Sequence, residues 1–72
     1  MTANRNLLNR KYGHVINALA KRRNIDLRQA MDIFYKSLTY LEMREGIADM
    51  HCRSDAYLAE EICIELEAGL SG

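Results

Sequence analysis

The sequence contains no proline and no tryptophan, and only four of its 72 residues are glycine. Linkers, low-complexity tracts and internal repeats are also missing, which predicts a single domain over residues 1–72. A chain of this length buries only about 60% of the surface that its unfolded form exposes. We therefore expect a core that supplies only about 3–5 kcal/mol of stability, to which a partner or a second copy would add.

Cysteines and long hydrophobic runs are equally scarce. Two cysteines, Cys52 and Cys63, are too few for a disulfide scaffold. No apolar stretch approaches the roughly 20 residues that a membrane span requires, and charged residues near the N-terminus interrupt the apolar run that a signal peptide needs. We expect a soluble cytoplasmic protein with reduced thiols and no membrane association.

The stretch GIADMHCRSDAYLAEE gathers four side chains with metal-binding or nucleophilic chemistry: Asp49, His51, Cys52 and Asp55. No CxxC or HxxxH pair is present to complete a metal site, and no glycine-rich loop accompanies the Cys–His pair to bind an oxyanion. Ser54 is a good helix N-cap, and an acid directly after it is favoured by the helix dipole. We therefore predict no catalytic residue, no metal site and no cofactor, and interpret the stretch as the lead-in to a helix.

Apolar residues recur at helical spacing along most of the chain, which predicts an all-α bundle. We expect three main helices, at about residues 4–22, 27–36 and 55–68, and a short helical segment near 38–44. The stripes expected in the core are Leu8, Tyr12, Val15, Ile16 and Leu19; then Leu27, Ala30, Met31, Phe34, Leu38 and Leu41; and finally Leu58, Ala59, Ile62, Cys63, Leu66 and Leu70.

Polar residues and glycines mark where these helices begin and end. Asp26 is an N-cap residue with Gln29 three positions on, the spacing of a capping box. Ser37 can cap a separate short helix and bend the path. Gly46 and Gly69 suit the position just past a helix C-terminus, where a left-handed backbone costs glycine least.

The charges are divided between the two halves of the chain. Residues 1–36 hold eight lysines and arginines and two acids, whereas residues 37–72 hold two and eight, so the halves carry +6 and −6. One interpretation is a small domain whose charged faces are simply solvated. The other is that the split favours binding functions, including a homodimer in which opposite charges attract. An alternative function is a nucleic-acid-binding regulator, whose phosphate contacts would come from Lys21, Arg22, Arg23 and Arg28.

The third helix also offers a candidate protein-binding face. Tyr57 and Ile64 lie together on a side away from the predicted core stripe. The flanking acids of this face are Glu60, Glu61 and Glu65. Because an apolar pair surrounded by acids is typical of a partner-facing helix, we predict that these five residues bind a protein. The alternative is that Tyr57 only packs its ring on the small core and keeps its hydroxyl in water.

Residues 25–62 contain two short motifs, Phe-Tyr-x-Ser-x-Thr-Tyr and Ser-x-x-Tyr-Leu. The motif residues are Phe34, Tyr35, Ser37, Thr39 and Tyr40, followed by Ser54, Tyr57 and Leu58. In these motifs the chain resembles a family of small bacterial helical proteins of unknown function, which are often encoded beside ADP-ribosyltransferase-like proteins. The resemblance implies a role as the antitoxin or accessory partner of such a protein.

Overall fold

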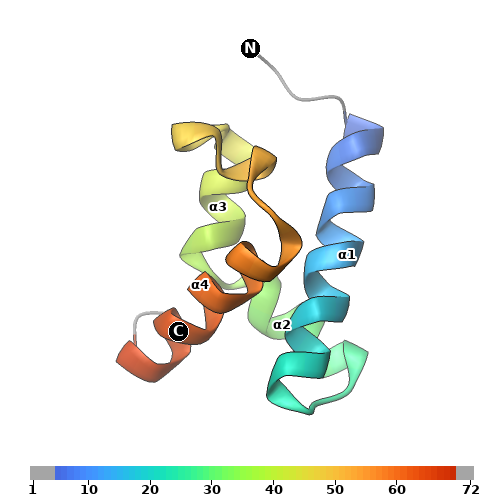
Figure 1. The fold of residues 1–72 in the computed structure, drawn as a ribbon, viewed down its shortest axis with the longest axis vertical. Coiled ribbons are helices and arrows are strands. Elements are labelled where there is room, and N and C mark those ends of the chain that lie inside the picture. The colour runs from blue at the N-terminus through green and yellow to red at the C-terminus, as the bar shows by residue number, and fades with distance from the viewer. Residues whose placement is uncertain (1–4, 70–72) are drawn as a thin grey trace.

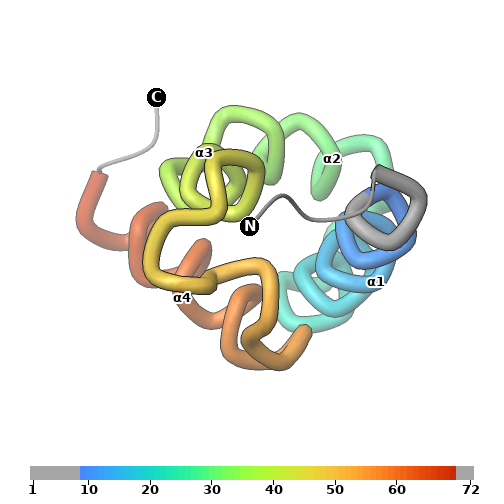
Figure 2. Tube along the Cα trace, turned by 90° about the horizontal axis from the view of Figure 1, so that it is seen from above, coloured from blue at the N-terminus to red at the C-terminus, as the bar shows by residue number. Residues whose placement is uncertain are grey.

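Helix α1 (Arg5–Arg23) runs along one side of the molecule and packs against two other helices, α2 (Leu27–Tyr35) and α4 (Asp55–Ala68). Helix α3 (Leu38–Glu45) packs against both α2 and α4. Seen from above, α2 and α4 lie on opposite sides of the molecule, with α1 and α3 between them (Figures 1 and 2).

The computed structural model describes residues 5–69, with side chains from residue 9 onward, and this range contains helices but no strand. The predicted all-α class is therefore confirmed, and the predicted helix bounds agree to within about one residue. The number of helices differs from the prediction. A 3₁₀ helix, η1 (Ile47–Cys52), occupies part of the stretch that we interpreted only as the lead-in to a helix.

Local capping groups fix three of the predicted helix boundaries. The Asp26 carboxylate accepts a hydrogen bond from the Gln29 backbone N–H at 2.8 Å, and the Gln29 side chain accepts one from the Asp26 N–H at 3.4 Å. Gly46 and Gly69 end α3 and α4 with φ values of +70° and +71°. The capping box and both glycine C-caps are thus confirmed.

Three residues other than glycine adopt left-handed backbone angles within the described range: Asn24, Ala48 and Asp49. Asn24, with φ of +55°, follows the last residue of α1 and ends that helix. Asparagine tolerates this conformation better than most residues. Ala48 and Asp49 lie inside η1 and break its regular path, so Met50 is buried while Ile47 faces solvent.

The core is drawn mainly from α1 and α4. Its buried apolar residues are Tyr12, Val15, Ile16, Leu19, Ala20, Ala30, Phe34, Met43, Met50, Leu58, Ala59, Ile62 and Cys63. This confirms the predicted stripes of α1 and α4, apart from Leu66, which is half-buried. Leu8 and Leu70, also predicted to be buried, lie outside the residues whose side chains are described.

The predicted core stripe of α2 and α3 is largely wrong. Only Ala30 and Phe34 are buried, whereas Leu27, Met31, Leu38 and Leu41 are exposed. The predicted stripe runs from α2 into α3 as if the two were one helix. The chain bends at Ser37, so α3 is a separate helix whose buried side is not a continuation of that of α2. In α3, Thr39 and Met43 therefore face inward.

Four aromatic rings join α1, α2 and α3. Tyr12 lies 5.5 Å from Phe34 and 5.3 Å from Tyr40 between ring centroids, and Tyr35 lies 4.9 Å from Tyr40. These tilted and edge-on contacts are favourable for aromatic pairs. Burial raises the pKa of the Tyr12 hydroxyl, the nearby Tyr40 and Tyr35 raise it further, and Arg44 opposes this effect.

We predict that Tyr12 makes the fold sensitive to alkali. Because its pKa is raised in the native state, the unfolded chain ionises first as pH rises above 10.0, the ordinary value for tyrosine. The stability that Tyr12 contributes is present below that pH and is lost as pH rises toward the native pKa. In thermal unfolding scans, the Tyr12→Phe variant should lose less stability between about pH 9 and 11 than the parent. Equal losses would contradict this assignment.

Candidate functional site

The solvent-facing side of α4 carries a small apolar patch bordered by acids. Ser54 starts the helix, since its hydroxyl oxygen accepts a hydrogen bond from the Tyr57 N–H at 3.1 Å. Tyr57 and Ile64 are seven residues, or about two turns, apart, and 42% and 51% exposed. Glu60 and Glu61 flank them, the first exposed and the second half-buried. We call these four residues the α4 face.

The aromatic ring of the α4 face contacts a positive charge. The Arg53 guanidinium carbon lies 5.6 Å from the centroid of the Tyr57 ring. This is within the range of a cation–π contact, which at an exposed site contributes about 0.5–1 kcal/mol. The contact places the Tyr57 ring beside Arg53 at the N-terminal end of α4. The glutamates of the α4 face lie further along the helix.

Glu65, which we predicted to border this face, points the other way. It is only 6% exposed. Its two carboxylate oxygens accept hydrogen bonds from the backbone N–H groups of Leu38 and Thr39, at 2.7 and 3.0 Å, and the Thr39 hydroxyl also donates to it. Glu65 is therefore a structural residue that caps the N-terminus of α3, where the helix dipole favours a negative charge.

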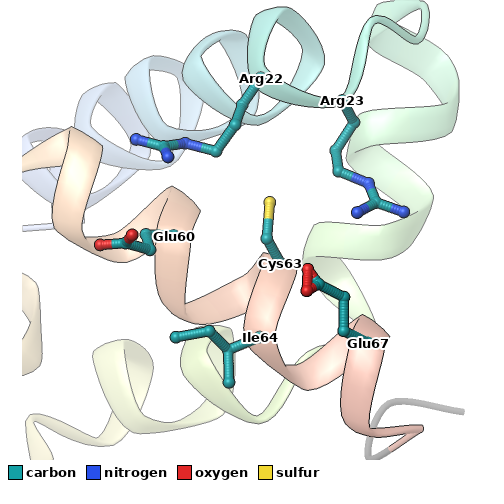
Figure 3. Close-up of a pocket in the computed structure, with 6 residues that line it drawn as sticks. All are labelled: Arg22, Arg23, Glu60, Cys63, Ile64 and Glu67. Atoms are coloured by element: carbon teal, nitrogen blue, oxygen red, sulfur yellow. The ribbon is translucent and has the colours of Figure 1, made fainter.

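Arginines and glutamates meet in a hollow between the end of α1 and α4. Its volume is about 340 Å³, and its lining residues are Arg22, Arg23, Glu60, Cys63, Ile64 and Glu67. Figure 3 shows the two arginines reaching down from α1, with the Cys63 thiol directed toward them and the carboxylates of Glu60 and Glu67 on α4. No ion pair within the described residues joins these arginines to these glutamates.

The residues predicted for nucleic-acid binding are all exposed, but they are not one isolated basic patch. Lys21, Arg22 and Arg23 form the last turn of α1, where cations interact favourably with the helix dipole. Arg28 lies in the first turn of α2 and does not line the hollow. Because Arg22 and Arg23 share their hollow with two carboxylates, a phosphate approaching them would also meet negative charge.

The four reactive residues of the stretch GIADMHCRSDAYLAEE do not converge on one point. The Asp55 carboxylate lies 2.7 Å from Lys11 Nζ and 3.9 Å from His14 Nδ1, so Asp55 links α4 to α1. Cys52 is exposed, and His51 is half-buried with an Nδ1 that has no hydrogen-bond partner among the described residues. Within residues 5–69, no three His, Cys, Asp or Glu side chains come together as a metal site would require.

No protein-family model matches this chain, and neither the curated proteins nor the solved structures contain a significant match to it. In the part of the chain that the structure describes, no helix combines the length and the apolar character needed to cross a membrane.

We predict that Glu65 is essential to the fold. Glu65→Ala would leave the N–H groups of Leu38 and Thr39 without acceptors, at a cost of about 1–3 kcal/mol for the buried Thr39 donor and less for the part-buried Leu38 donor. The matched control is Glu60→Ala, the same change on the exposed side of the same helix, which should alter stability by less than about 0.5 kcal/mol. Urea unfolding measures both. Equal stability of the two variants would show that the α3 N-terminus does not depend on Glu65.

Proposed function

We propose that this chain is a non-catalytic protein-binding module that acts in the cytoplasm and binds its partner through the α4 face. The observation that carries the proposal is the exposure of Tyr57 and Ile64 on a helix whose opposite side is buried in the core. Aromatic and aliphatic anchors surrounded by polar residues are typical of the centres of protein interfaces.

The resemblance of residues 25–62 suggests which class of protein the partner belongs to. We propose an ADP-ribosyltransferase-like protein, with this chain as its antitoxin or accessory subunit. The acidic border of the α4 face favours a basic rim on the partner, because complementary charges orient the two proteins as they meet.

The alternative function, nucleic-acid binding, is less favoured by the positions of the charges. Glu60 and Glu67 lie beside Arg22 and Arg23, the strongest candidates for phosphate contacts. Electrophoretic mobility shift at two salt concentrations separates the two functions, because binding to phosphates weakens steeply with salt.

We predict that the α4 face can be altered without harm to the fold. The triple variant Tyr57→Ala, Glu61→Lys and Ile64→Ala should keep the helical circular dichroism and melting temperature of the parent. It should also lose at least about 2 kcal/mol of binding free energy, roughly 30-fold in Kd. The measurement is copurification and calorimetric titration with an ADP-ribosyltransferase-like protein encoded in the same genome.

Two controls make this result specific. Ile47→Ala removes an isoleucine that is 49% exposed but belongs to η1 and not to the α4 face, and should leave binding unchanged. Ile62→Ala removes a fully buried side chain of α4 and should cost about 2–5 kcal/mol of folding stability. A folded triple variant that binds as the parent does would exclude the α4 face as the binding surface.

A further inference from the structure

A second exposed apolar surface lies on the side of the molecule opposite α4. Leu27, Met31 and Tyr35 follow one another at four-residue intervals along α2 and are all exposed. Together with Tyr12 and Ile16 of α1 they line a groove of about 280 Å³ between the two helices. We call it the α1–α2 groove.

The groove is open because one position of its α1 wall lacks a side chain. Gly13 lines the groove, and a Cβ atom added there would have no atom within 4 Å other than its chain neighbours and the backbone of its own helix. Leu27 and Tyr35, at the two ends of the groove, lie eight residues apart on α2, or about 12 Å along the helix axis. The groove is therefore long enough to receive two turns of a helix.

The exposed charges around the groove are mainly basic. Arg10 lies three residues before Gly13, Lys21 lies four residues after the groove residue Asn17, and Arg28 lies three residues before Met31. Side chains at these spacings are neighbours on a helix. None of the three basic residues forms an ion pair with a described residue, whereas the nearby acid Asp32 is paired with Lys36 at 3.2 Å.

The α4 face has the complementary chemistry on the same chain. Tyr57 and Ile64 are about 10 Å apart along the axis, close to the length of the groove, and Glu60, Glu61 and Glu67 surround them. We propose that the α4 face of one copy docks into the α1–α2 groove of a second copy, with the glutamates against Arg10, Lys21 and Arg28.

This contact would join two different surfaces, so it is heterologous. Helix α2, which supplies the exposed stripe of the groove, and helix α4 lie on opposite sides of the molecule (Figure 2). A dimer formed in this way therefore keeps one free groove and one free α4 face and can add further copies. A symmetric contact of groove against groove would instead place two basic rims together, which charge repulsion disfavours. The proposal is independent of the proposed function, since it needs no other protein.

The test uses two variants that each remove one of the two surfaces. Met31→Glu places an acid in the groove, at a side chain that is 46% exposed, and Ile64→Glu places one at the centre of the α4 face. Both positions are exposed helical sites, and Ile47→Glu is the matched control outside both surfaces. Sedimentation velocity from about 10 µM to about 1 mM spans the range in which a weak interface is half occupied.

We expect the parent and Ile47→Glu to associate with rising concentration at about 0.02 M salt and to dissociate as salt approaches about 0.3 M. Met31→Glu alone and Ile64→Glu alone should remain monomeric. Their equimolar mixture should form a dimer and nothing larger, because each variant supplies the surface that the other lacks. Gly13→Leu, which fills the groove without adding charge, should behave as Met31→Glu does.

Three results would overturn the proposal. One is a parent that stays monomeric over the whole range at low salt. Another is association of Ile64→Glu as strong as that of the parent, which would indicate a groove-to-groove contact. The last is a mixture of the two variants that stays monomeric. Partner capture is measured separately, and Met31→Glu should not weaken it, so failure of self-association and failure of the proposed function are distinguishable.

Discussion

The burial of the Glu65 carboxylate against the N-terminus of α3 is the contact on which the arrangement of this bundle depends. The first two backbone N–H groups of α3 donate to Glu65, and the third, that of Tyr40, donates to the Ser37 hydroxyl oxygen at 3.0 Å. The Ser37 hydroxyl in turn donates to the Phe34 carbonyl at 2.6 Å, which connects the end of α2 to the same network. Helices α3 and α4 thus meet at one carboxylate, and the Ser37 hydroxyl joins the end of α2 to the start of α3.

This contact also determines which side of α4 faces water. Once Glu65 points inward beside Leu58 and Ile62, a helix with 3.6 residues per turn must turn Tyr57 and Ile64 outward. The burial of Ala30 and Phe34 has a similar consequence for α2, because it leaves the stripe from Leu27 to Tyr35 on the surface. Both exposed apolar surfaces are therefore products of how the core is packed.

The local features of the fold could be predicted from the sequence, and the long-range ones could not. The capping box at Asp26 and the C-cap at Gly46 involve atoms within a few residues, so residue type and spacing suffice to identify them. Glu65 resembled any other surface glutamate, because its partner Thr39 is 26 residues away in the chain. In α2, both Ala30–Phe34 and Leu27–Met31 form apolar stripes, and periodicity alone does not say which of them packs against α1.

The same reasoning explains why the candidate site was predicted only in part. Helical geometry alone puts Tyr57 and Ile64 on an exposed side. The same geometry does not separate Glu65 from the surface acids next to it in sequence, so the prediction for Glu65 is wrong. The hollow that joins Arg22 and Arg23 to Glu60 and Glu67 depends on the packing of α1 against α4. No spacing rule within one helix contains that information.

The two proposals use the same residues of α4, and this links them. A copy whose Tyr57 and Ile64 are docked in a neighbour's groove cannot present them to another protein. A partner that binds free α4 would therefore draw copies out of the self-associated form by mass action. The groove would be left open in the resulting complex, since nothing in the α4 contact covers Met31. The self-associated form would then hold copies that are released when a partner binds. A domain of this size is too small to bury all of its apolar surface alone.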